Sequence, residues 1–97
     1  MKTFKNKNIL YNTEMNTIIQ LKSEINNINN ELVDIIIRRI EISKKLGREK
    51  NKLGFPILNP SREVDIYVKL QQTNPEHFKY LKPIFEEILQ QSRLIQN

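Results

Sequence analysis

The chain has 97 residues, a formal net charge of +5 and no cysteine. This length predicts one small domain, because chains usually have roughly 100 to 200 residues per domain. The absence of cysteine excludes disulfides, a thiolate nucleophile and cysteine-ligated metals, and His77 alone cannot form a histidine metal cluster. Apolar runs are too short for a membrane span, which needs about 20 residues, or for a signal peptide, which needs at least ~7. We expect a soluble, cytoplasmic protein that needs no cofactor and does not bind a membrane.

The positive charge is concentrated at the start of the chain, where Lys2, Lys5 and Lys7 supply most of the excess. Beyond Asn8 charges of both signs are interspersed, which is typical of an ordinary solvated surface. Nucleic acid is therefore not an expected partner. Binding to nucleic acid stays a minor alternative, which a salt-dependent mobility shift can test.

The first element in chain order is a long helix. Residues 1–13 show no sustained periodicity and are expected to form a flexible extension before a domain of residues 14–97. A heptad series of mostly apolar residues, the seam, then begins: Ile18, Leu21, Ile25, Ile28, Leu32, Ile35, Arg39, Ile42 and Leu46. This spacing predicts a helix from about Thr13 to Asn51, roughly 58 Å long. Such a helix cannot bury its seam within so short a chain.

A shorter helix follows the break at Gly54, Phe55 and Pro56. Asn59 is the expected N-cap and Pro60 the first helical residue of a helix that runs to about Gln72.

A third helix of medium length is predicted by the same signal at Asn74 and Pro75. It should run to about Gln96, with a possible kink at Pro83. No strand-like alternation occurs anywhere. The fold class is therefore all-α, with a bundle that a partner chain completes.

Two cations interrupt the apolar pattern of the long helix. Arg39 occupies a seam position, and Lys50 lies eleven residues later, three helical turns on and facing the same way about 16 Å along the axis. A seam arginine can extend to solvent, set the register, pair with an acid or face a pocket. Because Arg39 and Lys50 share one face, they could hold a small anion between them.

The other two helices offer polar groups of matching chemistry. Ser92 interrupts the apolar seam of the third helix, and Gln96 follows one turn later on the same side. Arg62 and Glu63 lie in the first turn of the second helix, where the helix dipole favours the glutamate and disfavours the arginine. Taken together, these side chains suit a polyanion that carries a hydroxyl or an ether.

Three sequence blocks resemble the small, single-domain, all-helical chorismate mutase family (type II). The first begins LKSEI at residues 21–25, reaches Arg39 and continues as LGREK at residues 46–50. The second is PILNPSRE at residues 56–63, and the third is FEEILQQSRLIQ at residues 85–96. The blocks occur in order and span nearly the whole of residues 14–97, which the resemblance identifies as a chorismate mutase domain.

The resemblance implies an intertwined six-helix homodimer in which each site takes residues from both chains. It implies the rearrangement of chorismate to prephenate, for phenylalanine and tyrosine biosynthesis. This is a pericyclic reaction that needs no nucleophile or acid–base pair. Catalysis would come from holding the substrate in its reactive conformation and from donors aimed at the ether oxygen.

Carried over by position, the resemblance implies a role for each candidate residue. Catalysis would rest on Lys50 and Gln96 at the ether oxygen and on Arg39, which with Ser92 would hold a carboxylate. The remaining expected substrate-binding residues are Lys22, Asn59, Arg62 and Glu63. Arg62 would fix the anion, Glu63 with backbone near Asn59 would bind the ring hydroxyl, and Lys22 would reach the neighbouring chain's site.

Two of these residues depart from the family pattern. Lys22 stands where the family usually has arginine, and lysine lacks the planar two-pronged donor. Asn59 replaces the commoner aspartate, keeps the cap and removes a charge beside the hydroxyl site.

Three alternatives remain open at this point. The chain could be an isochorismate pyruvate lyase or a mutase acting on aminodeoxychorismate, the amino analogue of chorismate, in the same fold. It could also be a non-catalytic helical dimer.

Overall fold

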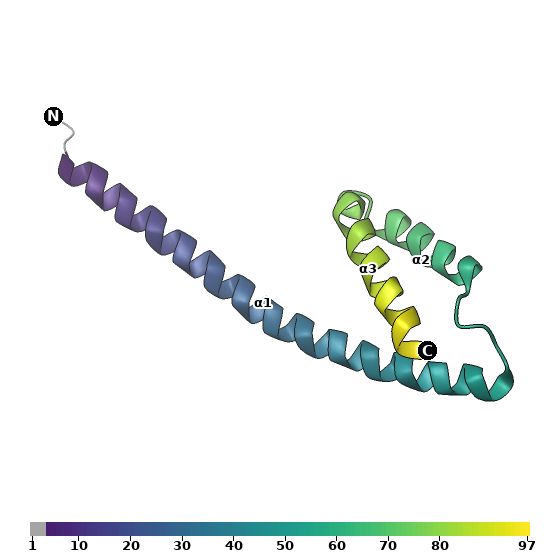
Figure 1. The fold of residues 1–97 in the computed structure, drawn as a ribbon. Helices are drawn as coiled ribbons and strands as arrows, with labels where there is room; N and C mark the ends of the chain where they lie inside the picture. Colours follow the sequence, from purple (N-terminus) through teal and green to yellow (C-terminus); the bar gives the residue numbers. More distant parts are fainter. Residues whose placement is uncertain (1–3) are drawn as a thin grey trace. The chain divides into compact units, whose positions relative to one another are not determined.

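The computed structural model describes the backbone of residues 4–97 and the side chains of residues 10–97. Three helices follow one another in the chain: α1 (Phe4–Leu53), α2 (Pro60–Thr73) and α3 (Phe78–Gln96) (Figure 1). No strand occurs between residues 4 and 97, which confirms the all-helical prediction. The chain divides into two compact units, one ending at Ile37 and one spanning Arg38–Asn97, so that α1 contributes residues to both.

Helix α1 begins earlier than the sequence predicts. Its first residue is Phe4 rather than a residue near Thr13. The physical reason is that no glycine or proline occurs before Gly47, so nothing in this stretch stops a helix from extending toward the N-terminus. The expected flexible extension falls partly on residues 1–3, which lie outside the described residues. The domain boundary after residue 13 stays a prediction.

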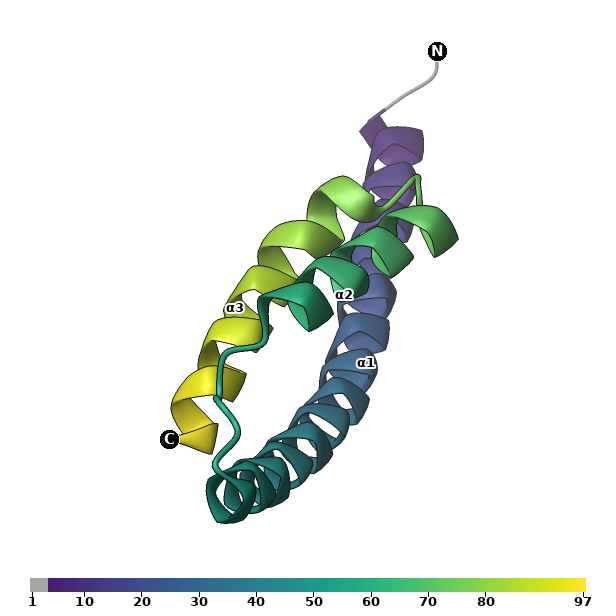
Figure 2. The same ribbon diagram turned by 90° about the vertical axis from the view of Figure 1, so that its right-hand side faces the viewer.

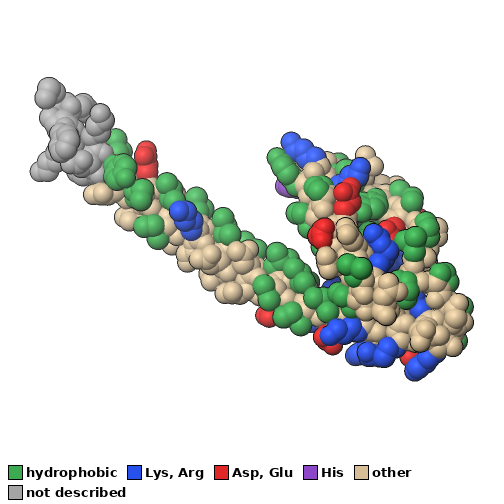
Figure 3. Space-filling model, in the orientation of Figure 1, with side chains coloured by type: hydrophobic (Ala, Val, Ile, Leu, Met, Phe, Trp, Pro, Cys, Tyr) green, Lys and Arg blue, Asp and Glu red, His purple; other side chains and the backbone are tan. Residues whose placement is uncertain are grey.

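The described part of the first unit carries an apolar seam whose side chains are exposed. Every side chain from residue 10 to residue 37 is exposed. The seam residues from Ile18 to Ile35 keep between 45% and 59% of their surface exposed. Figure 3 shows hydrophobic side chains distributed along this part of α1.

In the second unit, α1 ends in a Schellman motif at Gly54. Gly54 has a φ of 71°, a conformation that glycine adopts without a Cβ penalty. The Phe55 amide donates to the Lys50 carbonyl at 2.8 Å, and the Gly54 amide donates to the Asn51 carbonyl at 3.3 Å. The cap directs the chain away from α1 and into the segment that leads to α2.

Helix α2 begins as the sequence predicts. The Asn59 side chain is the N-cap, and its Oδ1 accepts from the Arg62 amide at 3.2 Å and from Ser61 Oγ at 3.0 Å. Pro60 is the first helical residue, where its missing N–H leaves no hydrogen bond unmade. This cap fixes the orientation of the first turn, which carries Arg62 and Glu63.

Helix α3 begins at Phe78, so the prediction that Asn74 caps it is wrong. Asn74 instead ends α2: its amide donates to the Leu70 carbonyl at 2.9 Å and its Nδ2 donates to Thr73 Oγ1 at 2.8 Å. Because this side chain is turned back toward α2, it cannot cap a following helix. Pro83 lies inside α3, and the helix continues past it to Gln96.

Helices α2 and α3 lie side by side and form the core of the second unit (Figure 2). Leu89, with 5% of its surface exposed, is the one buried apolar residue among the described side chains. It is supported by half-buried apolar residues of both helices: Ile66, Leu70, Leu81, Phe85 and Ile88. The core is small, so these half-buried apolar side chains must supply much of the hydrophobic stabilisation of the second unit.

Within the described part of the chain, no helix is apolar over a long enough stretch to span a bilayer.

Candidate functional site

The centre of the candidate site is a hydrogen bond between α1 and the last turn of α3. The Lys50 ammonium donates to Gln96 Oε1 at 2.9 Å and to the Ile57 carbonyl at 2.9 Å. Lys50 is half-buried, so its head group is held at the site instead of extending freely into solvent. An ammonium has three hydrogens, and these two acceptors leave one for a ligand.

Gln96 continues a chain of hydrogen bonds from Lys50 toward the interior. Its Nε2 donates to Ser92 Oγ at 3.1 Å, and the Ser92 hydroxyl is 3.1 Å from that of Ser43. Both serines are buried. The chain fixes the amide of Gln96 with its oxygen on Lys50 and its nitrogen toward Ser92, and one amide hydrogen remains available for a ligand.

Gly47 allows α3 to come this close to α1. A Cβ at this position would lie 2.7 Å from both the Cα and the carbonyl oxygen of Gln96, a contact with backbone that no side-chain rotation relieves. The absence of a side chain at Gly47 therefore allows the Gln96 backbone to lie close to α1, where the Gln96 side-chain amide accepts from Lys50.

Arg39 lies half-buried on α1, one turn before Ser43. Burial, followed by the nearby positive charge of Arg62, lowers the pKa of Arg39 from the ordinary arginine value. No carboxylate pairs with Arg39 within residues 10–97, where the three recorded salt bridges join other residues. Two guanidinium groups with unbalanced charge therefore lie near each other, and an anion would relieve their repulsion.

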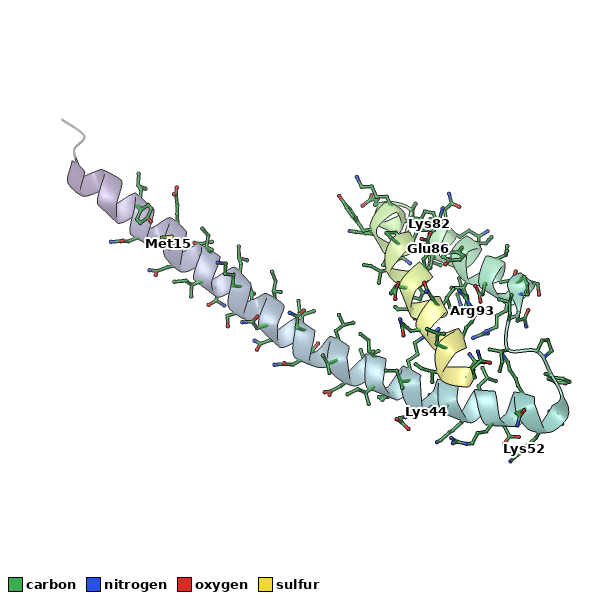
Figure 4. All side chains as sticks on the ribbon, viewed as in Figure 1. Met15, Lys44, Lys52, Lys82, Glu86 and Arg93 are labelled. Carbon is green, nitrogen blue, oxygen red and sulfur yellow. The ribbon has the colours of Figure 1, made fainter. Side chains whose placement is uncertain are left out.

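Glu63 is held by an arginine that sequence reasoning did not identify. Arg93 Nη1 donates to both carboxylate oxygens of Glu63, at 2.7 and 2.6 Å. The Arg93 side chain extends from α3 beside α2 (Figure 4). No local spacing links the two residues, which lie on different helices, so only the packing of α2 against α3 reveals the pair.

Seven of the eight expected site residues belong to the second unit, and Lys22 belongs to the first. Those in the second unit lie on the three helices or, for Asn59, at the cap of α2: Arg39, Lys50, Asn59, Arg62, Glu63, Ser92 and Gln96. Asn59 is already engaged as the α2 cap. Lys22 lies in the first unit with an exposed side chain, and its predicted part in a site stays a prediction.

A surface cavity of about 390 Å³ borders this site, with Gly47, Ile57 and Gln96 in its lining. Its cationic residues are Lys44 and Arg48, whereas Arg39 and Arg62 do not line it. The cavity therefore adjoins the Lys50–Gln96 pair without enclosing the two arginines. In the described residues, no cluster of histidine, aspartate and glutamate could hold a metal ion.

The chain is similar to curated relatives that are named as mutases of chorismate or of its amino analogue. The chain is 32% identical over 60 residues to a chorismate mutase of Methanocaldococcus jannaschii. This match covers 62% of this chain and 61% of the relative. It is 30% identical over 81 residues to a bifunctional chorismate mutase/prephenate dehydratase of Aquifex aeolicus, covering 77% of this chain and 22% of the relative. A 4-amino-4-deoxychorismate mutase of Streptomyces venezuelae is 32% identical over 50 residues, covering 52% of this chain and 48% of the relative. The chain thus spans less than two thirds of these relatives, and no solved structure matches it significantly.

The sequence model of the family described as chorismate mutase type II matches residues 21–97. This range contains every residue placed in the candidate site, from Lys22 to Gln96, together with all of α2 and α3. The match covers well over half of the chain, and the chain therefore belongs to the chorismate mutase type II family.

Proposed function

We propose that the protein is a chorismate mutase that rearranges chorismate to prephenate. The observation that carries the proposal is the convergence of Lys50 and Gln96, joined at 2.9 Å, with each retaining a hydrogen that can be donated to a ligand. Membership of the family and the names of the relatives support the same activity.

The reaction asks the protein for positioning and charge stabilisation. As the carbon–oxygen bond breaks and the carbon–carbon bond forms, negative charge grows on the ether oxygen. Lys50 and Gln96 donate to that oxygen and stabilise the transition state more than the ground state. Their supporting contacts to Ile57 and Ser92 exist before substrate arrives, so little reorganisation is needed during the reaction.

The substrate carboxylates meet the two arginines. Arg39, assisted by Ser92, holds one carboxylate, and Arg62 helps to fix the anion. The lowered pKa of Arg39 supports this role, because a guanidinium disfavoured by burial and by Arg62 gains most from a bound anion. Held at both ends, chorismate is kept in the folded conformation that can react.

The ring hydroxyl of chorismate donates to Glu63 in this proposal. The carboxylate lies in the first turn of α2, which the Asn59 cap orients, and backbone near Asn59 assists. An ionised carboxylate has roughly four acceptor positions, so Glu63 can bind Arg93 and a hydroxyl together.

The proposed assembly is a homodimer in which Lys22 of one chain completes the site of the other. The exposed apolar seam of the first unit supports it, because a heptad series on a helix normally packs against another helix. The proposed place of the reaction is phenylalanine and tyrosine biosynthesis in the cytoplasm.

A second candidate is the same rearrangement of the amino analogue of chorismate. The 4-amino-4-deoxychorismate mutase of Streptomyces venezuelae supports it, because that relative is 32% identical to this chain over 50 residues. In both reactions Arg39 and Arg62 would hold the substrate carboxylates. The two substrates differ at the ring substituent that faces Glu63.

The test is the disappearance of chorismate with the purified protein at neutral pH, with prephenate confirmed by its acid conversion to phenylpyruvate. Arg39→Ala is the control, and it should lose at least ~100-fold in kcat/KM. A folded wild-type dimer that leaves chorismate unchanged contradicts the proposal. Turnover retained by Arg39→Ala contradicts the site.

A further inference from the structure

The contact between Arg93 and Glu63 uses only part of the arginine. Both hydrogen bonds leave from Nη1, one to each carboxylate oxygen of Glu63. Within residues 10–97, no hydrogen bond is recorded for the Nη2 or Nε groups of Arg93. The pair is partly buried, with 35% of the Arg93 side chain and 24% of the Glu63 side chain exposed. A ligand that approaches Glu63 therefore meets an acceptor and a spare donor on the same pair.

This combination matches a hydroxyl and mismatches an amine. A hydroxyl can donate its hydrogen to Glu63 and accept one from Arg93 through its oxygen lone pairs. An alkyl ammonium has hydrogens to donate and no lone pair to accept with. It also carries a positive charge that Arg93 repels, and in a partly dry site this repulsion is stronger than in water.

We propose that Arg93 is a specificity-determining residue that makes the site select a ring hydroxyl over a ring amine, and so chorismate over its amino analogue. The inference rests on the proposed function, because it takes Glu63 as the residue that faces the ring substituent. Glu63 alone would favour the cationic amine, and Arg93 reverses that preference by balancing its charge.

The charged surroundings of the pair are consistent with this role. Tyr67 on α2 lies within the same group of residues: burial, then Glu86 and Glu63, raise the pKa of Tyr67, and Arg93 opposes them. The phenol is therefore neutral at physiological pH and adds no charge beside the ring. Glu86 and Arg93 both belong to α3 (Figure 4), so the loss of Arg93 would remove the cation that opposes Glu63 and Glu86 at Tyr67.

The experiment compares kcat/KM for chorismate and for 4-amino-4-deoxychorismate in the wild type and in Arg93→Gln. We expect the wild type to prefer chorismate, and the ratio of the two values to shift at least tenfold toward the amine in the variant. Arg93→Lys keeps the charge and should restore the wild-type preference. Arg38→Gln removes an exposed arginine of α1 that is neither an expected site residue nor part of the cavity lining, and it should leave the ratio unchanged.

A purely structural role for Arg93 predicts a different result, in which both substrates lose activity in proportion and the ratio stays constant. That result overturns the inference, as does a wild type that uses the amine as well as chorismate. Thermal unfolding confirms that each variant is folded, and Arg93→Met replaces the glutamine variant if it is not.

Failure of the proposed function is recognised separately. A wild type that turns over neither compound contradicts the mutase proposal, and calorimetric titration with the two compounds then decides the selectivity. Tighter binding of chorismate by the wild type, weakened relative to the amine in Arg93→Gln, supports the inference. Equal binding, or no binding, overturns it.

Discussion

The heptad series of α1 runs through both units of the chain, but its residues and their burial differ between them. In the first unit the seam is continuously aliphatic, and every side chain from residue 10 to residue 37 is exposed. In the second unit the series reaches Arg39, and buried Ser43 and Gly47 lie beside it on α1. Hydrogen bonds between side chains of different helices occur in the second unit, whereas the hydrogen bond from Thr17 Oγ1 to the Thr13 carbonyl, in the described part of the first unit, is local. The contrast supports the proposal that the first unit serves association and that most of the proposed site lies in the second.

The largest effect should follow from breaking the seam of the first unit. Ile28→Glu puts a charge into the proposed dimer contact, where an unpaired buried charge is strongly unfavourable. We expect loss of the dimer and, with it, of essentially all activity, measured by light scattering on a sizing column and by the chorismate assay.

Asn30→Glu is the matched control for this seam variant. Asn30 lies about 200° around the helix from Ile28, on the side away from the seam, so its variant should remain dimeric. An active, dimeric Ile28→Glu protein would show that the first unit has another role.

The next effect concerns Lys50 in the second unit. Lys50→Ala removes a transition-state donor, and such a loss typically costs at least ~100-fold in kcat. Lys52→Ala, two residues on, removes only an exposed lysine paired with Glu49, and its kcat should match that of the wild type. Steady-state kinetics checks both variants, and a Lys50→Ala enzyme with normal kcat contradicts the assignment.

A smaller loss should follow from adding one methyl group at Gly47. Gly47→Ala forces the Gln96 backbone to move, so we expect roughly tenfold lower kcat and about 1 to 3 kcal/mol less stability. Gly54→Ala is a useful contrast, because a Cβ there has nothing within 4 Å although the φ of 71° disfavours alanine. It should lower stability alone, and denaturant titration alongside the assay separates the two cases.

A gain is expected at Lys22, the one proposed site residue in the first unit. Lys22→Arg provides a planar two-pronged donor for a carboxylate and should lower KM by up to about tenfold with kcat unchanged. Lys22→Gln, which removes the charge, should raise KM. If the arginine variant is inactive, Lys22 does not act through a substrate carboxylate.

The smallest effect tests whether Arg39 serves binding at the expense of stability. The lowered pKa of Arg39 means that its charged form is less favoured in the folded chain than in the unfolded chain. At neutral pH, far below either pKa, this difference destabilises the fold, so Arg39→Met should raise the free energy of unfolding. The gain should be only about 0.5 kcal/mol, because partly exposed charges are screened. Unfolding in urea measures it, and a marked loss of stability would assign Arg39 a structural role.

Sequence reasoning succeeded where the signals are local. The Asn59–Pro60 start of α2 and the exposed seam depend on residues a few positions apart, and the structure has both. The predicted starts of α1 and α3 were wrong for opposite reasons. No residue stops α1 from extending toward the N-terminus, and Asn74, the predicted cap of α3, ends α2 instead.

The site was predictable only in part, because its geometry depends on packing. The family resemblance named Lys50 and Gln96, and the structure joins them at 2.9 Å. The pairing of Arg93 with Glu63 has no counterpart in sequence spacing, and neither does the contact of Gly47 with the Gln96 backbone. Both arise from how α3 packs against the other helices of its unit.

Lys50 also constrains the segment that follows it. Its carbonyl accepts from the Phe55 amide in the α1 cap, and its ammonium donates to the Ile57 carbonyl. Connecting segments usually tolerate insertions and deletions. Here, however, one residue holds the segment at two points, so an added or deleted residue between Gly54 and Ile57 changes which carbonyl meets the ammonium. The proposed role of Lys50 therefore makes the length of this short segment a requirement for activity, and selection should keep that length fixed while the side chains vary.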